Sequence, residues 1–255
     1  MALLEVKNLT VFYPSSPSPA LEGVSFQLKR GEILCIVGES GSGKSTLLRA
    51  IAGLLHPDCR IEGEITFKGE KIPPQRGLEK FMGKEVGFIF QEPSAYLDPL
   101  FKVGGQIEET CKIHFPDSNC GEKTLNSLRY CGFPNPEEVY EKYPHELSGG
   151  QKQRVNIADA VVNNPSLLLA DEPTSSLDVS TQKSVLELFL KLKRDGKAVL
   201  MVTHDFGVVW EIADRVLVIK DGKKVEEGSV FEIYENPRHP YTRKLVEIFK
   251  KLSLF

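Results

Sequence analysis

The chain has 255 residues, of which 41% are hydrophobic and 26% are charged, and its formal net charge at pH 7 is −3. This length fits one large α/β domain with a small insert, since single cores grow to about 250 residues before they divide. The composition excludes a disordered or fibrous chain. The lack of a basic surplus argues against nucleic acid as a partner.

The cysteines and the apolar runs indicate the compartment. No two of the five cysteines form a CxxC pair; they are Cys35, Cys59, Cys111, Cys120 and Cys131. We interpret this pattern as typical of a reducing, cytosolic compartment. No signal-peptide pattern is present near Met1 and no stretch approaches the roughly 18 apolar residues of a membrane span, so we expect contact with a membrane only through partners.

The first predicted elements form a small antiparallel sheet. Residues 3–13 (LLEVKNLTVFY) and 24–32 (VSFQLKRGE) alternate apolar and polar positions, and the turn-forming run PSSPSP separates them at 14–19. Residues 63–72 (GEITFKGEKI) have the pattern of a hairpin of the same kind.

A second set of predicted strands is apolar along its whole length, as expected of strands that are covered on both faces. Helix-like segments follow several of them, among them 46–55 and 179–196. The chain therefore predicts βα units around a mostly parallel sheet. These strands are 33–37 (ILCIV), 86–90 (VGFIF), 166–171 (SLLLAD), 198–203 (AVLMVT) and 215–220 (RVLVIK).

The expected fold class is thus α/β, with a P-loop NTPase core, a small antiparallel sheet and an inserted helical subdomain. Residues 92–162 carry helix-like patches and no strand of comparable strength. We predict one domain over 1–255, in which residues 1–91 and 163–235 form a RecA-like core, 92–162 the helical subdomain and 236–255 a tail helix.

The segment GESGSGKS at 38–45 matches the phosphate-loop pattern G-x-x-x-x-G-K-[ST], directly between a predicted strand and a predicted helix. In such a loop the glycines let backbone N–H groups wrap a phosphate chain, Lys44 reaches the outer phosphates, and Ser45 offers a hydroxyl to Mg²⁺. The alternative is a glycine-rich turn with a chance lysine. The predicted ATP or GTP contacts are Gly38, Glu39, Ser40, Gly41, Ser42, Gly43, Lys44, Ser45 and Thr46.

Polar side chains follow three of the apolar strands. Asp171 is expected to hold the magnesium, and Glu172 to polarise a water aligned on the γ-phosphate. His204 is expected to contact the γ-phosphate and keep that water in line, although a lone histidine is more often structural. Gln91 can contact both metal and water. The alternative for the two acids is that they cap the next turn.

The loop LSGG at 147–150 begins a second helix with an anion-binding start, expected from about residue 150 to 163. At about 1.5 Å per residue this helix is on the order of 20 Å long, so its start and the phosphate loop cannot easily hold one nucleotide. The simplest solution is that Ser148, Gly149, Gly150 and Gln151 cap the nucleotide of a second subunit related by two-fold symmetry.

These motifs, in this order, resemble the nucleotide-binding subunits of ABC transporters over essentially the whole chain. The resemblance makes 38–45 the Walker A motif, Gln91 the Q-loop, LSGGQ the signature, LLLADE the Walker B motif, and His204 the switch histidine. It implies that Asp178, in the D-loop SSLD, contacts nucleotide. It also implies that Tyr13 stacks on adenine; the alternative is an exposed tyrosine at a strand end.

The resemblance also implies activity and partners. The chain is expected to be an ATPase that uses ATP and Mg²⁺, closes as a homo- or heterodimer, and lies at the cytoplasmic face of the cell membrane. Two transmembrane permease subunits are expected to dock in a groove of the helical subdomain near Gln91. An extracytoplasmic solute-binding protein takes part indirectly.

The segments FQEPSAYLDPL at 90–100 and HPYTRKL at 239–245 resemble the peptide and nickel importer branch, so the expected cargo is a peptide or a related solute such as nickel or an oligosaccharide. Alternatives are a soluble ABC-type ATPase acting on DNA or in translation, the ATPase of an exporter, and a small P-loop kinase. The sequence gives no role for Asp159 or for the HPYT motif.

Overall fold

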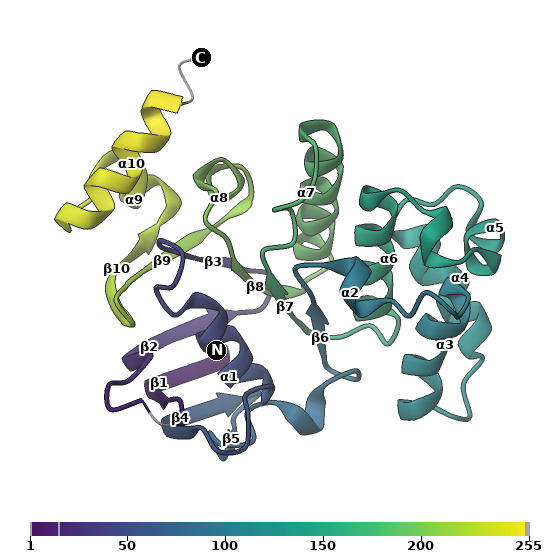
Figure 1. Cartoon of the computed structure of the whole chain (residues 1–255), viewed down its shortest axis with the longest axis horizontal. Coiled ribbons are helices and arrows are strands. Elements are labelled where there is room, and N and C mark those ends of the chain that lie inside the picture. Colours follow the sequence, from purple (N-terminus) through teal and green to yellow (C-terminus); the bar gives the residue numbers. More distant parts are fainter. Residues whose placement is uncertain (1, 15, 253–255) are drawn as a thin grey trace. The chain divides into compact units, whose positions relative to one another are not determined.

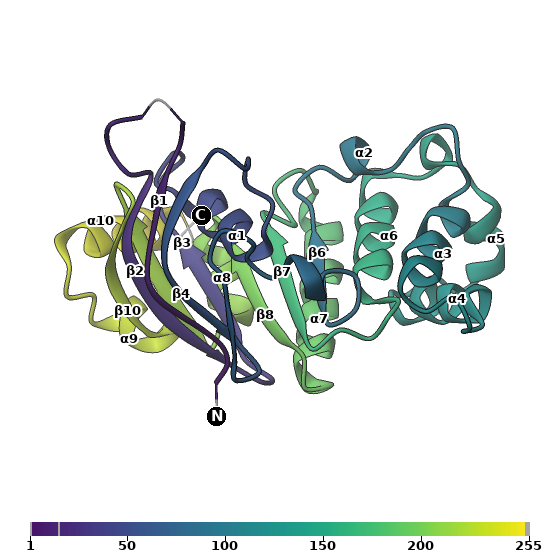
Figure 2. The same ribbon diagram turned by 90° about the horizontal axis from the view of Figure 1, so that it is seen from below.

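The computed structural model describes residues 2–14 and 16–252. The chain forms two compact units, Met1–Lys80 with Leu192–Phe255, and Phe81–Lys191. We call them the first and the second unit. Both appear in Figures 1 and 2, and each is described by itself.

The first unit contains a four-stranded sheet in the order β2-β1-β4-β5, whose strands lie side by side in Figure 1. The three pairings within it are all antiparallel, as the alternation in the sequence predicted. The second strand ends three residues before the expected position, because Gly31 adopts a left-handed turn conformation with φ of 64°. The strands are β1 (Ala2–Phe12), β2 (Leu21–Lys29), β4 (Arg60–Phe67) and β5 (Glu70–Ile72).

The first unit also contains strands in the order β10-β9-β3-β8. Central β3 is parallel to β8 and β9 and, like β8, is buried along its length. This agrees with the expected parallel core, whereas the polar strand β10 had no sequence signal. The strands are β3 (Ile33–Val37), β8 (Ala198–Val202), β9 (Arg215–Lys220) and β10 (Lys223–Ser229). The helices are α1 (Lys44–Ala52), α8 (Phe206–Ile212), α9 (Val230–Glu235) and α10 (Pro240–Leu252). The 3-10 turn η1 (Glu79–Phe81) begins in the first unit and ends at the first residue of the second.

The second unit combines a parallel strand pair with packed helices. Between residues 93 and 161 every described element of secondary structure is a helix or a 3-10 turn. Helices α3 to α6 pack against one another (Figure 1). Strand β6 lies against α6 so closely that a Cβ on Gly87 would be 2.2 Å from the Ala160 carbonyl oxygen. The elements are β6 (Val86–Ile89), α2 (Pro93–Tyr96), α3 (Val103–His114), α4 (Cys120–Tyr130), α5 (Pro136–Glu141), η2 (Pro144–Glu146), α6 (Gly149–Val161), β7 (Leu167–Asp171) and α7 (Val179–Arg194), whose last three residues belong to the first unit.

The structure joins Cys111 of α3 to Cys120 of α4 in a disulfide, a pairing that the spacing of the cysteines did not indicate. The two positions are nine residues apart, and the turn between the helices brings them together. Cys35, Cys59 and Cys131 are buried free thiols.

The tail forms a helix that starts at Pro240, where the fixed φ of proline suits the first helical turn. The last three residues of the predicted tail helix, 253–255, lie outside the described part of the chain. Among the described helices, none combines the length and the apolar character that a bilayer crossing requires.

Candidate functional site

The loop of residues 38–43 connects β3 to α1, as the phosphate-loop motif predicts. Its lysine lies inside the loop, because the Lys44 ammonium donates hydrogen bonds of 2.8 Å to the carbonyl oxygens of Gly38 and Glu39. The Lys44 side chain is held in place by burial, with the residue only 5% exposed, whereas Ser45 and Thr46 behind it are half-buried. The loop therefore fixes a cation at the start of a helix, which is the arrangement that binds phosphate.

Two glycines of this loop cannot be replaced without displacing backbone. A Cβ on Gly38 would lie 2.2 Å from the Ile219 carbonyl oxygen of β9, and one on Gly43 would lie 2.8 Å from the Ala20 carbonyl oxygen. Gly43 also has a φ of 100°, a region that favours glycine. These glycines are therefore needed where other segments of the same chain approach the loop closely, as well as where a ligand needs space.

Tyr13 lies beside the phosphate loop. Its hydroxyl is 3.0 Å from the hydroxyl of Thr46 in the first turn of α1, and the residue is 39% exposed. An exposed aromatic ring next to the loop provides a surface on which a base can stack.

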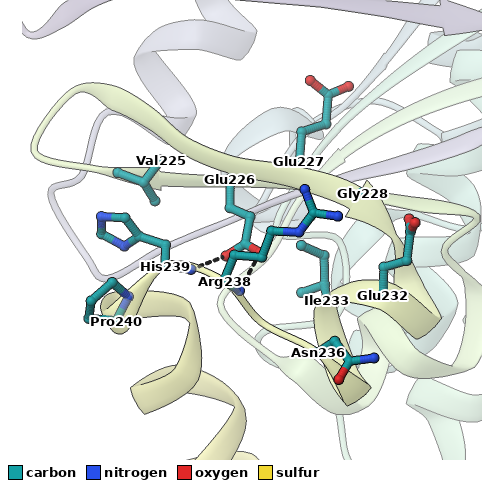
Figure 3. A pocket seen from close by; sticks show the side chains of 10 residues that line it. All are labelled: Val225, Glu226, Glu227, Gly228, Glu232, Ile233, Asn236, Arg238, His239 and Pro240. Carbon is teal, nitrogen blue, oxygen red and sulfur yellow. Dashed lines mark hydrogen bonds between the residues drawn. The ribbon is translucent and has the colours of Figure 1, made fainter.

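A residue that the sequence analysis did not assign also contacts the loop. The Tyr241 hydroxyl accepts a hydrogen bond of 2.8 Å from the Glu39 backbone N–H. Tyr241 belongs to the HPYT motif, whose turn is fixed by Glu226: its carboxylate accepts from the backbone N–H groups of Arg238 and His239, at 2.8 and 3.0 Å (Figure 3). The motif thus has a physical function, which is to support the phosphate loop from the tail. A proline at a helix start was its only sequence signal.

His204 lies at the same edge of the first unit as the phosphate loop. Strands β3 and β8 are parallel, and Ile36 is paired with Val202. Gly38 and His204 each follow two residues later, so both emerge at the carboxyl ends of adjacent strands. His204 is exposed, whereas Thr203 before it is buried and accepts a hydrogen bond from the Asp205 backbone.

In the second unit, the same register argument brings Gln91 and Glu172 together. Ile89 of β6 is paired with Ala170 of β7, and each polar residue follows two positions later. The Gln91 side-chain amide donates a hydrogen bond of 3.3 Å to the Glu172 carboxylate. Asp171, the last residue of β7, is buried. The structure therefore groups the predicted metal, water and base residues of this unit.

The backbone of Glu172 is strained. Its φ is 45°, a left-handed conformation that a residue with a side chain rarely adopts. Such strain costs about 1–3 kcal/mol and is concentrated at functional sites. The conformation turns the chain sharply at the end of the buried strand, so that Glu172 is half-buried immediately after a fully buried Asp171.

The signature loop, residues 147–151, caps α6. The Ser148 hydroxyl accepts a 3.3 Å hydrogen bond from the Gln151 N–H, and the Gln151 side chain accepts one of 3.0 Å from the Ser148 N–H. A Cβ on Gly149 would meet nothing within 4 Å, whereas one on Gly150 would lie 2.2 Å from the Thr181 side chain of α7. The loop is thus packed on one side and open on the other.

Asp178 has a structural function at the start of α7. Its carboxylate accepts hydrogen bonds from the hydroxyls and backbone N–H groups of Thr181 and Ser180. These bonds, above all that of the Thr181 hydroxyl, lower the pKa of Asp178 to about 2. The stabilisation by this cap is therefore complete above about pH 4 and is lost as the pH falls through 2.

The family model described as ABC transporter matches residues 21–175, which is more than half of the chain. The chain belongs to the ABC transporter family. An ABC cassette of this kind is an ATPase that binds ATP.

Two relatives illustrate the position of this cassette within the family. An oligopeptide transport ATP-binding protein, OppD, of Lactococcus lactis subsp. cremoris is 43% identical over 252 residues, with 96% of this chain and 75% of the relative covered. A dipeptide transport ATP-binding protein, DppD, of Haemophilus influenzae is 41% identical over 254 residues, with 96% of this chain and 77% of the relative covered.

Solved cassettes have the same fold. The cassette MJ0796, in a dimeric post-hydrolysis state bound to ADP and Pi, has a TM-score of 0.76 and 34% identity, with 89% of this chain and 98% of that one covered. CbiO1 of Clostridium perfringens, part of an ABC transporter complex, has a TM-score of 0.80 and 30% identity, with 99% of this chain and 95% of that one covered. The predicted ABC ATPase fold is thereby confirmed.

Proposed function

We propose that this cassette hydrolyses ATP to drive the uptake of peptides through a membrane transporter. The observation that carries the proposal is the enclosed Lys44 ammonium at the start of α1, with two glycines of its loop in close contact with neighbouring backbone. The named relatives, which serve oligopeptide and dipeptide transport, favour peptides over nickel or an oligosaccharide as the cargo.

The oxygen donors of Ser45, Gln91 and Asp171 suit Mg²⁺, which prefers hard oxygen ligands and shares its coordination with phosphates and water. Among the described residues, no group of three or more His, Cys, Asp and Glu side chains is close enough to hold a metal by itself. Bound Mg²⁺ would neutralise charge on the phosphate oxygens.

Hydrolysis is assigned to three side chains. Glu172 acts as general base on the attacking water, and its hydrogen bond with Gln91 orients the carboxylate. His204 contacts the γ-phosphate from the carboxyl end of β8. The residues of the phosphate loop and the start of α1, from Gly38 to Thr46, hold the β- and γ-phosphates. Tyr13 stacks on the base.

The signature loop is proposed to complete the site of a second subunit. Ser148, Gly149, Gly150 and Gln151 present the N-terminus of α6, whose partial positive charge favours the γ-phosphate. The open space at Gly149 leaves room for that approach, and Asp178 supports it by capping α7. The dimeric states of MJ0796 support this assembly. ATP then favours the closed dimer, because loss of the γ-phosphate removes one of its contacts.

The partners that turn closure into transport are proposed to be two membrane-spanning permease subunits, which place the cassette at the cytoplasmic face of the membrane, with a solute-binding protein acting indirectly. Their docking surface is a groove of about 790 Å³ in the second unit, lined in part by Tyr96, Phe101 and Ile113. It begins five residues after Gln91, so docking there can influence the Q-loop.

The substitution Glu172→Gln tests the hydrolytic assignment. We expect ATP binding to persist, ATP-dependent dimers to live longer, and turnover to fall by about two to four orders of magnitude, the usual contribution of a general base. Phosphate release and gel filtration with ATP measure both effects. Glu187→Gln, on the exposed face of α7, is the matched control. Near-normal turnover in Glu172→Gln would remove Glu172 from this role.

A further inference from the structure

The groove of the second unit combines an apolar rim with an acidic floor. Its rim carries three strongly exposed apolar side chains, Leu100 at 78%, Phe101 at 61% and Ile113 at 68% exposure. Its lining comes from the segment after Gln91, from α3, from Tyr143 before η2, and from Asp159 of α6. Large apolar side chains that remain exposed around a groove mark a surface for another protein.

Asp159 lies in this groove with one carboxylate oxygen unpaired. The residue is only 6% exposed, and the Tyr96 hydroxyl donates to its Oδ2. Oδ1 is buried and has no hydrogen-bond partner in the described part of the chain. A buried carboxylate oxygen without a donor is costly, because desolvation is not offset by a bond.

The carboxylate is nevertheless expected to be charged near neutral pH. Burial raises the pKa of Asp159 to about 6, against the lowering effects of the Tyr96 and Thr110 hydroxyls beside it. Above that pH the groove holds a desolvated negative charge, which is stabilised when a cation approaches.

The other charged groups of the groove leave this negative charge uncompensated. Asp98 and Glu109 also line it and add negative charge. Lys102 is the one lysine or arginine among the described lining residues, and its ammonium pairs with Glu141. The groove is therefore complementary to a basic group brought by a partner.

We propose that Asp159 receives an arginine or lysine side chain from the permease segment that docks in this groove. The apolar stem of that side chain would pack along Phe101 and Ile113, and its charged end would pair with the Asp159 carboxylate. Long basic side chains bury their stems in this way while their charged ends remain paired. The proposal rests on the proposed function, because it names the chemistry by which the cassette recognises its membrane partner.

The experiment uses the full chain assembled with the membrane-spanning subunits of its own transporter in lipid nanodiscs, and measures the affinity of assembly. Asp159→Asn keeps the shape of the side chain and removes its charge. We expect the affinity of assembly to fall by about 30-fold or more, as when one member of a buried charge pair is removed. Asp159→Arg should abolish assembly. Replacing one arginine or lysine of the permease's cytoplasmic segments by aspartate should restore assembly with Asp159→Arg.

The control variant is Asp117→Arg, an exposed acid of the same unit outside the groove. The unfolding temperature and ATP affinity of each isolated chain show whether the variants fold. The inference would be overturned if Asp159→Asn assembled with wild-type affinity, or if no charge reversal in the permease restored the assembly of Asp159→Arg. Either result would leave the proposed function intact. Failure of the wild-type chain to assemble with any membrane-spanning subunit would instead overturn the proposed function, and the inference with it.

Discussion

The phosphate loop and the signature loop are both glycine-rich helix starts, but they satisfy their polar groups differently. In the phosphate loop the Lys44 ammonium is bonded to carbonyl oxygens of its own loop, and glycines touch neighbouring backbone. In the signature loop Ser148 and Gln151 cap each other, and Gly149 faces open space. The difference indicates that the first loop is a complete cradle within one chain, whereas the second has room for a ligand held elsewhere.

The largest effect is expected from Ser148→Arg, which fills the open side of the signature loop with a long side chain. ATP binding by the monomer should be unchanged, because the phosphate loop is untouched, whereas ATP-dependent association should fall by more than about 100-fold. Gel filtration and light scattering with ATP measure the association. Glu187→Arg, at an exposed position of α7, controls for the added positive charge. An unchanged ATP-dependent dimer would refute the comparison between the two loops.

The disulfide lies within the second unit. Cys120→Ser should lower the free energy of unfolding by about 2.5 kcal/mol, the value expected for a closed loop of this length. The phosphate loop lies in the first unit, so ATP affinity should change little. Urea unfolding with and without reductant measures the effect, and a reductant-insensitive wild-type chain would show that the thiols are not joined.

Paired glycine substitutions compare the two loops directly. Gly43→Ala should cost about 1–3 kcal/mol and weaken ATP binding, because alanine is strained at a φ of 100° and its Cβ meets the Ala20 carbonyl oxygen. Gly149→Ala should change stability by no more than about 0.5 kcal/mol, since its Cβ meets nothing. Chemical unfolding measures both, and equal losses would contradict the assigned difference.

The smallest effect is expected from Tyr241→Phe, which removes the hydroxyl that accepts from the Glu39 N–H. One neutral hydrogen bond corresponds to a loss of about threefold to tenfold in ATP affinity, with little change in the maximal rate. Calorimetric titration with ATP and steady-state kinetics separate the two quantities. Tyr234→Phe, in α9, is the matched control, and identical affinities for both variants would show that the tail does not support the loop.

Much of the fold could be predicted from the sequence, because apolar runs and glycine motifs encode local geometry. The continuous run at 33–37 indicated a buried strand, and the pattern after it indicated a loop and a helix. The polar strand β10 gave no such signal, since it gains its hydrogen bonds from β9. The pairing of Cys111 with Cys120 was also missed, because spacing alone does not show which thiols a helical turn brings together.

The sequence by itself determined which residues can perform the chemistry: a lysine after glycines, acids and amides after buried strands, and a serine before a helix. The tertiary structure decided what supports and surrounds them. Tyr241 reaches Glu39 across 202 positions, Gln91 reaches Glu172 across 81, and Asp159 lies in a groove that four segments form. The reason is physical: dihedral preference and periodicity act between near neighbours, whereas burial, strand register and unpaired charge depend on how distant segments pack.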